Sequence, residues 1–506
     1  MSKLVLQIES ELRARIKQAL ETAIKEGELA GAELPDFSIE IPGDSSHGDY
    51  STNAAMAGAR GFKCAPMKIA QCILKYFEAG KYFSAPVAAG PGFINFSLTD
   101  AFFAEVLMDI AVCGESYGRS DFGGGKKVMV EFVSANPTGP MHIGNARGGA
   151  LGDCLAGVLD FAGYNVSREF YINDAGNQIE RFGASLDARY RQLFMEGVPF
   201  PEDGYQGEDI KDRAGEFAKI HGDAYLKTDS EERVRTLTDY ALKKNIEALK
   251  EDLGSYRIEY DVWFRESSLY ESGELDETIA LMKQRGLTYE KEGALWYKAT
   301  EYGGEKDEVL IRQNGNPTYF AADIAYHRNK LLTRGFDLAI DVWGADHHGH
   351  VARMKGVLDA IGLGGSRLDV VLMQLVRLMR DGEAVKVSKR TGKSITLKTL
   401  LDEVPVDAAR FFFNMREHSS HLEFDLDLAV EQSNQNPVYY TQYAHARICS
   451  ILRNIEKEGI HPREVNREEL LLLTLPEERE LIRHLASLTS EIILSAKQYD
   501  PSRITR

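Results

Sequence analysis

The sequence predicts an α/β protein whose central domain is built on a parallel sheet, with an α+β segment before it and a helical segment after it. Three observations favour this organisation. An apolar, β-branched run at residues 128–133 is followed by a helical pattern from Asn145 and a second strand pattern at 166–171. Residues 4–26 form one amphipathic helix pattern, and from about residue 400 the apolar spacing turns helical. A chain of 506 residues is too long for one core, so about three or four domains are expected.

Composition and charge narrow the classes of function. The net charge of −17 disfavours broad, nonspecific binding of nucleic acid, although it permits a local basic surface. We expect no membrane partner, because no run of eighteen apolar residues appears and the N-terminus lacks a signal-peptide core. The five cysteines are scattered without a C-x-x-C pair, which favours a reducing cytoplasm and argues against a thiolate zinc site.

The N-terminal region begins with the predicted helix, which Gly27 ends. Its apolar stripe consists of Ile8, Leu12, Ile16, Leu20 and Ile24. A turn and a strand are expected at residues 90–96. His47 and Asp49 could be candidates for catalysis, but the Gly, Asp and Asn residues around them suit turns, and we favour that structural interpretation.

The 128–171 stretch has the length of a βαβ unit. Pro137 and Pro140 break the first strand, and Gly163 suits the left-handed position after the helix. The loop between strand and helix lies at the carboxyl end of a parallel strand, where open α/β sheets bind ligands. Free N–H groups at the helix start suit phosphate, to which His142 could donate. The alternative is a Pro/Gly loop with an ordinary surface histidine.

The string His142-Ile143-Gly144-Asn145 resembles the H-I-G-H signature of class I aminoacyl-tRNA synthetases, with Asn in the last place. The run from Glu131 to Pro140 resembles the arginyl-tRNA synthetase family in particular. This resemblance implies a Rossmann-like class I catalytic domain at 111–395, an N-terminal domain at 1–110 that contacts the tRNA elbow, and a helical anticodon-binding domain at 396–506 that ends earlier than in relatives. An insertion is expected at about 186–305. We expect no editing there, because a pocket that pairs a polar group rejects analogues by about 10⁴-fold.

A second constellation, at residues 317–327, contains Tyr319 and Asp323. Their spacing of four places them on one helix face, and a carboxylate can accept a guanidinium in a bidentate way. The alternative is a capped helix in which Asp323 pairs with Arg328. The resemblance implies an arginine site that comprises Glu131, Ser134, Asn136, His142, Tyr319, Asp323 and His347.

A strand pattern at 337–342 leads into a histidine-rich segment, 344–350. Three histidines and an aspartate have the ligand chemistry of a zinc site. The resemblance favours contacts with substrate instead, and we expect no metal there. Many relatives carry glutamines where this chain has Asp346 and His347.

The third constellation, Lys386 to Lys393, resembles the second class I signature, K-M-S-K-S, with Val387 for Met and Arg390 for the last Ser. A solvated run of charge is the alternative. Together with the first signature it predicts a clamp for a triphosphate, in which cations stabilise the departing pyrophosphate. The resemblance implies an ATP site that comprises Pro140, His142, Gly144, Asn145, Gly344, Asp346, Lys386, Ser388 and Lys389. It also implies that the catalytic residues are His142, Lys386 and Lys389.

A helix capped by Asn436 is predicted to run to Gly459. In isolation it could be a core helix, whereas the resemblance implies tRNA contacts from Tyr439, Tyr443 and Arg447. The family's activity would require L-arginine, ATP with Mg²⁺, and tRNA(Arg), with tRNA needed even for activation. We expect a cytoplasmic monomer. Two alternatives remain: another adenylate-forming enzyme of the same superfamily, and a non-catalytic, synthetase-like RNA-binding protein.

Overall fold

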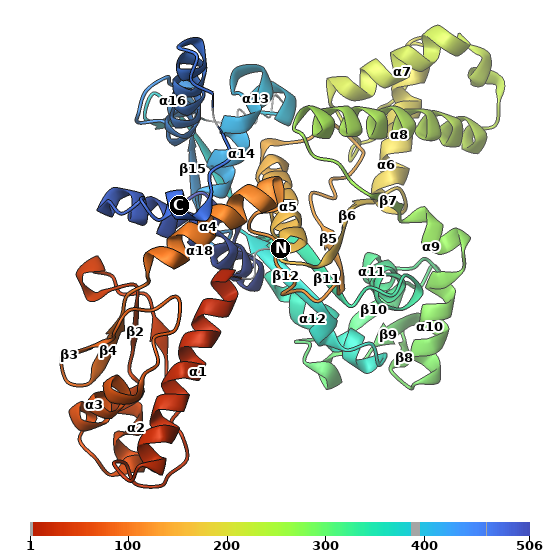
Figure 1. The fold of residues 1–506 in the computed structure, drawn as a ribbon. Coiled ribbons are helices and arrows are strands. Elements are labelled where there is room, and N and C mark those ends of the chain that lie inside the picture. The colour runs from red at the N-terminus through yellow and green to blue at the C-terminus, as the bar shows by residue number, and fades with distance from the viewer. Residues whose placement is uncertain (1–3, 386–394, 462) are drawn as a thin grey trace. The chain divides into compact units, whose positions relative to one another are not determined.

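The structure is a computed structural model that describes residues 4–385, 395–461 and 463–506 (Figure 1). The chain divides into two compact units. One contains residues 1–122 and 453–494, and the other contains residues 123–452 and 495–506. The predicted domains, residues 1–110, 111–395 and 396–506, are divided by function and not by compactness, and their boundaries stay a prediction. Among the described helices, none is long and apolar enough to span a membrane.

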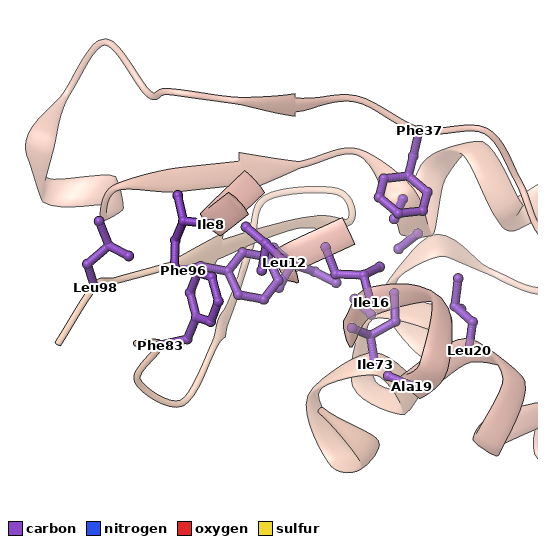
Figure 2. Packing of buried hydrophobic residues seen from close by; sticks show 14 of the residues in the cluster. Ile8, Leu12, Ile16, Ala19, Leu20, Phe37, Ile73, Phe83, Phe96 and Leu98 are labelled. Atoms are coloured by element: carbon purple, nitrogen blue, oxygen red, sulfur yellow. The ribbon is translucent and has the colours of Figure 1, made fainter. Parts of the chain in front are cut away.

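The first unit places the predicted amphipathic helix, α1 (Leu4–Lys25), against α3 (Pro66–Tyr76). The stripe residues Ile8, Leu12, Ile16 and Leu20 are at most 1% exposed, which confirms the predicted core face (Figure 2). A four-stranded antiparallel sheet has the order β1-β2-β4-β3. Within residues 4–122, the strands and remaining α-helices are β1 (Ile39–Glu40), β2 (Tyr50–Thr52), β3 (Val87–Ala89), β4 (Phe93–Phe96), α2 (Ala54–Phe62) and α4 (Asp100–Cys113). Asp49 accepts the Leu98 N–H at 2.7 Å, in keeping with a structural role.

The second unit is built on a parallel sheet, as predicted. The sheet has five strands in the order β12-β11-β5-β6-β7. Its strands are β5 (Lys127–Glu131), β6 (Asn165–Ile172), β7 (Val262–Arg265), β11 (Leu338–Gly344) and β12 (Leu368–Met373). Helix α5 (Ile143–Phe161) connects β5 to β6 and completes the predicted βαβ unit. After β5 the chain adds β6 and β7 on one side of that strand, and it later adds β11 and β12 on the other side. The strand order therefore reverses at β5, and ligands are expected at the carboxyl ends of β5 and β11.

The first strand of this unit ends two residues earlier than the apolar run predicts. Val133 and Ser134 adopt left-handed backbone conformations, with φ of 69° and 41°. Such angles are strained for a β-branched residue and are typical of functional sites. Ser134 Oγ fastens the turn, since it donates to Glu131 Oε1 at 2.8 Å and accepts the Tyr171 N–H at 3.1 Å.

The insertion predicted at about 186–305 is not one separate block, because β7 of the parallel sheet lies within it. Two groups of elements lie in and around this range. Helices α6 (Asn177–Gln192), α7 (Glu208–His221) and α8 (Ser230–Ser255) enclose their own apolar core. The other group combines α9 (Ser267–Glu271) and α10 (Glu274–Gln284) with an antiparallel sheet of order β10-β9-β8. The strands of that sheet are β8 (Thr288–Lys291), β9 (Ala294–Tyr297) and β10 (Glu308–Ile311). Helices α11 (Tyr319–Arg328) and α12 (His348–Ala360) follow, and the second packs beside β12.

Beyond residue 400 the prediction of helices is only partly right. Helices α13 (Leu397–Glu403), α14 (Val406–Asn414), α15 (Leu426–Val430), α16 (Pro437–Lys457) and α18 (Pro476–Gln498) are present. However, β15 (Leu422–Asp425) is a strand that pairs in parallel with β13 (Val376–Arg380), which also pairs with β14 (Glu383–Ala384). Leu422 and Phe424 are buried while Glu423 is exposed, an alternation of period two that is too short to detect in a helical context.

Candidate active site

A cavity of about 360 Å³ opens at the carboxyl ends of β5 and β11. Four of its lining residues carry carboxylates: Glu131, Glu266, Asp323 and Asp341. Tyr171, Tyr319, Tyr326 and Trp343 contribute aromatic walls. The cavity therefore combines concentrated negative charge with flat apolar surfaces, a composition that suits a planar organic cation.

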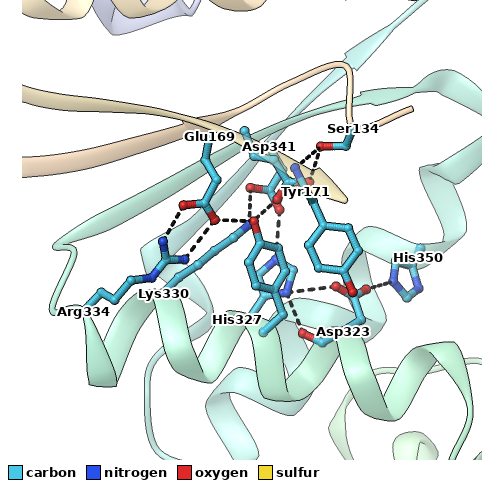
Figure 3. Close-up of polar contacts among 11 residues, drawn as sticks. Ser134, Glu169, Tyr171, Asp323, His327, Lys330, Arg334, Asp341 and His350 are labelled. Atoms are coloured by element: carbon cyan, nitrogen blue, oxygen red, sulfur yellow. Dashed lines mark hydrogen bonds and ion pairs between the residues drawn. The ribbon is translucent and has the colours of Figure 1, made fainter. Parts of the chain in front are cut away.

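Asp323 lies on α11, and the side chain of its N-cap residue, Thr318, accepts the Ala321 N–H. Two imidazoles hold its carboxylate (Figure 3). His350 Nε2 lies 2.6 Å from Oδ2, and His327 Nδ1 lies 3.1 Å from Oδ1. Burial alone would raise the pKa of Asp323, but the two histidines lower it below its usual range, so the carboxylate is ionised. Each oxygen keeps lone pairs for a donor inside the cavity. The alternative pairing with Arg328 does not occur, since that arginine contacts Glu277.

Beneath the cavity, Lys330 lies between two buried carboxylates (Figure 3). Its Nζ donates to Glu131 Oε2 at 2.5 Å and to Asp341 Oδ1 at 2.9 Å. The Lys330 side chain is fully buried. His327 Nε2 lies 2.9 Å from Asp341 Oδ2, so both of its ring nitrogens face carboxylates. Burial opposes the charged imidazole, yet these carboxylates raise the pKa of His327 to about 10. The cationic side chains of Lys330 and His327 thus alternate with three carboxylates, and each carboxylate has a cationic partner. The carboxylates belong to Glu131, Asp341 and Asp323.

Glu266 is a cavity residue that sequence reasoning missed. It follows β7 directly, so it stands at the same edge of the sheet as Glu131. Burial raises the pKa of Glu266 to about 7, although hydrogen bonds from Tyr171 and Tyr270 partly offset this effect. Asp174 fixes its position by accepting the Ser267 N–H at 2.8 Å and the Arg265 Nε at 2.7 Å. The signal in the sequence is a carboxylate that closely follows a short apolar run, but the prediction places this segment in the insertion.

The first signature, residues 142–145, comprises the N-cap residue and the first three residues of α5. His142 is exposed and stands at the N-cap of the helix, and Gly144 is open to solvent. Backbone bonds tie the start of α5 to the residues that follow the second signature. The Ile143 N–H donates to Ile395 O at 3.0 Å, and the Leu397 N–H donates to Met141 O at 2.9 Å. Lys386, Ser388 and Lys389 themselves lie outside the described residues.

The structure brings together six of the predicted site residues, and all of them line the cavity: Glu131, Ser134, Tyr319, Asp323, Gly344 and His347. Asn136 lies outside the lining and donates to Gln178 at 2.8 Å. The Asp346 side chain is 82% exposed. Within residues 4–385, 395–461 and 463–506, no three or more His, Cys, Asp or Glu side chains are arranged to hold a metal ion.

The three predicted tRNA contacts form a ladder on α16. The rings of Tyr439 and Tyr443 are stacked with centroids 6.1 Å apart, and the Arg447 guanidinium lies 5.8 Å from the centre of the Tyr443 ring. Stacked aromatic rings beside a cation are a surface on which bases can stack.

Comparison with known families gives three matches in sequence order. A model described as the Arginyl tRNA synthetase N terminal domain matches residues 10–98. The model for tRNA synthetases class I (R), catalytic domain, matches residues 108–449, and the DALR anticodon binding domain matches residues 441–506.

Comparison with individual proteins agrees. The arginine–tRNA ligase of Ruminiclostridium cellulolyticum is 57% identical over 506 residues, which cover 99% of this chain and 90% of the relative. That of Caldanaerobacter subterraneus is 57% identical over 507 residues, covering 100% and 90%. Among solved structures, a Campylobacter jejuni protein provisionally assigned as an arginyl-tRNA synthetase is 34% identical, with a TM-score of 0.71 over 81% of this chain and 88% of that one. The Thermus thermophilus arginyl-tRNA synthetase, at 21% identity and a TM-score of 0.70, covers 98% of this chain and 89% of its own and shares the fold.

Proposed function

This chain belongs to the class I arginyl-tRNA synthetases and is an arginine–tRNA ligase, and from that premise we propose that its acidic cavity holds the side chain of L-arginine. The observation that carries the proposal is the ionised carboxylate of Asp323, which two imidazoles hold in one orientation. A guanidinium presents parallel N–H donors in a plane, and a fixed carboxylate accepts two of them. Glu266 would accept from the other edge of the guanidinium, and the Tyr319 ring would cover its face.

The other end of the amino acid lies toward β5. Glu131 and Asn136 bind the α-amino and carboxylate groups, with Ser134 and His347 beside them and His142 nearby. Glu131 already meets Lys330 and Ser134, so its carboxylate keeps one orientation. Holding the arginine carboxylate at a fixed angle to ATP is worth several kcal/mol of barrier, about 7 or more in favourable intramolecular cases.

ATP binds at the entrance to α5, where Pro140, Gly144, Asn145, Gly344 and Asp346 contact the nucleotide. The arginine carboxylate attacks the α-phosphate in line, and the bond to pyrophosphate breaks, which leaves arginyl-adenylate. His142 donates to the phosphate oxygens. Lys386 and Lys389, with Ser388, neutralise the charge that develops on pyrophosphate. Mg²⁺ enters with ATP as part of the substrate. No side chain forms a covalent bond.

In the second step the arginyl group passes to the 2′-hydroxyl of the terminal adenosine of tRNA(Arg), and AMP leaves. The ladder of Tyr439, Tyr443 and Arg447 contacts the tRNA, and residues 1–110 contact its elbow. We assign activation to residues 111–395 and anticodon binding to residues 396–506. Bound tRNA is required for the first step as well.

The test is arginine-dependent exchange of labelled pyrophosphate into ATP, with and without tRNA(Arg), and with lysine as the control amino acid. Exchange that needs arginine and tRNA together is the expected result. Exchange with another amino acid would favour a different adenylate-forming enzyme. Binding of arginine and ATP without exchange would favour a non-catalytic, synthetase-like protein.

We also propose that the protein is a cytoplasmic monomer. The five cysteines are free thiols, as a reducing compartment requires. Sedimentation at micromolar concentration, with and without tRNA(Arg), tests the oligomeric state, and a two-fold increase in mass without tRNA would overturn it.

A further inference from the structure

Arg147 is a buried cation that neither signature includes. It lies on the second turn of α5, five residues after His142, and is 1% exposed. Its hydrogen bonds all go to backbone carbonyls. Nη1 donates to Gln374 O at 2.7 Å and to Ser420 O at 3.0 Å, and Nη2 donates to Glu417 O at 3.0 Å. Burial lowers the pKa of Arg147 to about 10.

These carbonyls belong to the two segments that introduce the small sheet of β13, β14 and β15. Gln374 joins β12 to β13, and residues 417–420 precede β15. The two segments are also bonded to each other, because the Gln374 N–H donates to His418 O at 2.9 Å. One guanidinium therefore connects α5 to both entrances of the sheet. From β14 the chain runs through Val385, whose N–H donates to Leu378 O at 2.9 Å, into the second signature.

Joining a helix to a sheet through a buried charge carries a free-energy penalty. Desolvation of an ion costs several kcal/mol, and well-packed apolar residues often give equal or greater stability. What the guanidinium adds is direction, since its donors lie in a fixed plane and fit carbonyls at set angles. Arg147 thus specifies the orientation of the sheet relative to the helix as well as its contact with it.

We propose that Arg147 is a positioning residue, which sets the β13–β14 hairpin relative to the start of α5, where ATP is proposed to bind. This inference rests on the proposed function of the first signature, residues 142–145. It predicts that loss of the Arg147 guanidinium weakens the binding and alignment of ATP more than the binding of arginine. The cavity residues Asp323, Lys330 and Asp341 are held by contacts that do not involve Arg147.

The experiment compares Arg147→Lys and Arg147→Met with the parent chain in tRNA-dependent pyrophosphate exchange. Lysine keeps the charge but lacks the planar pair of terminal nitrogens with which arginine contacts the three carbonyls, whereas methionine removes the charge. We expect kcat/KM for ATP to fall about 10-fold to 100-fold in Arg147→Met, and less in Arg147→Lys. The KM for arginine should change less than two-fold, and thermal unfolding is recorded beside each assay.

Arg410 supplies the matched control. It is half-buried, contacts α5 through Asp153 and donates to the carbonyls of Tyr256 and Arg257 at 3.2 and 3.0 Å, rather than to the segments that precede β13 and β15. Arg410→Lys should lower the unfolding temperature without changing the ratio of the KM values for ATP and arginine. An equal rise of both KM values in the Arg147 variants would overturn the proposal, as would failure of both to fold while Arg410→Lys folds. If the parent chain shows no exchange, the proposed function fails and not this inference.

Discussion

Asp323 and His142 stand at the same edge of one sheet but are held in different ways. Asp323 faces the cavity with both carboxylate oxygens against imidazoles, and the network behind it is buried as far as Lys330. His142 is exposed, and the contacts that fix its surroundings are backbone hydrogen bonds to residues 395 and 397. The end of the site proposed for arginine is therefore held by a buried network of hydrogen bonds, whereas the end proposed for the nucleotide offers a helix terminus and an exposed imidazole.

The difference follows from what each ligand demands. A guanidinium differs from other cations in the plane and spacing of its N–H donors. Carboxylates can recognise this difference only if their orientations are fixed. A triphosphate is recognised by its charge, and helix N–H groups and cations satisfy that without a buried network. Specificity should consequently depend on the buried side chains and rate on the exposed ones.

The strongest test of this contrast removes the charge of Asp323. Asp323→Asn should lower kcat/KM for arginine about 10³-fold, because truncating a buried, hydrogen-bonded charge pair costs about 4 kcal/mol. Pyrophosphate exchange with varied arginine measures the loss. The control is Asp203→Asn, whose side chain is 62% exposed and lies outside the proposed site, and which should change the arginine parameters less than about two-fold. A loss below ten-fold in Asp323→Asn would assign the guanidinium to another acceptor.

The second test concerns the rigidity of the network itself. Lys330→Met leaves Glu131 and Asp341 without their shared cation, and removing one member of a buried ion pair costs about 3 kcal/mol or more. Urea unfolding should show this loss. Arg377→Met is the matched control, because its ion pair with Glu423 is 3.5 Å long and both side chains are over 60% exposed. It should cost less than about 1 kcal/mol. Equal stability of Lys330→Met and the parent would show that the carboxylates simply take up protons.

The third test addresses the exposed end. His142→Ala should lower kcat about 100-fold, as expected for loss of one donor to a developing negative charge. Its effect on the KM for arginine and on thermal stability should be negligible, because the side chain is exposed. Steady-state aminoacylation with each substrate varied separates these effects. If the KM for arginine rose as steeply as kcat fell, the two ends of the site would not be independent.

The difference between local and long-range contacts determines how much of this structure the sequence predicts. The βαβ unit, the helices at α1 and α16, and the shared face of Tyr319 and Asp323 depend on residues close together in the chain, and all were predicted correctly. Lys330 was missed, because it meets Glu131 199 residues away and no local pattern requires that meeting. Glu266 was missed because its role requires knowing that β7 pairs with β6. The strand β15 was missed because four residues carry too little periodicity.

Glu266 gives the smallest and most diagnostic effect. Burial raises its pKa to about 7, so the side chain loses its charge as the pH falls below that value. If it accepts from the guanidinium, kcat/KM for arginine should fall by up to about ten-fold per pH unit below 7. Glu266→Gln should give a lower value that varies less between pH 6 and 7.5. An unchanged slope in that variant would place the titration on another group.

The same carboxyl should affect stability in the opposite direction. Its pKa in the folded chain lies above the usual 4.5, so the folded state binds more protons than the unfolded state between pH 4.5 and about 7. The contribution of Glu266 to the free energy of unfolding therefore declines as the pH rises through this window, while arginine affinity increases. Urea unfolding of the parent and of Glu266→Gln at pH 5 and pH 7 measures the difference. If Glu266 accepts from the guanidinium, a carboxylate that lowers stability near pH 7 contributes to recognition instead, and the desolvation of its charge is offset when the guanidinium binds.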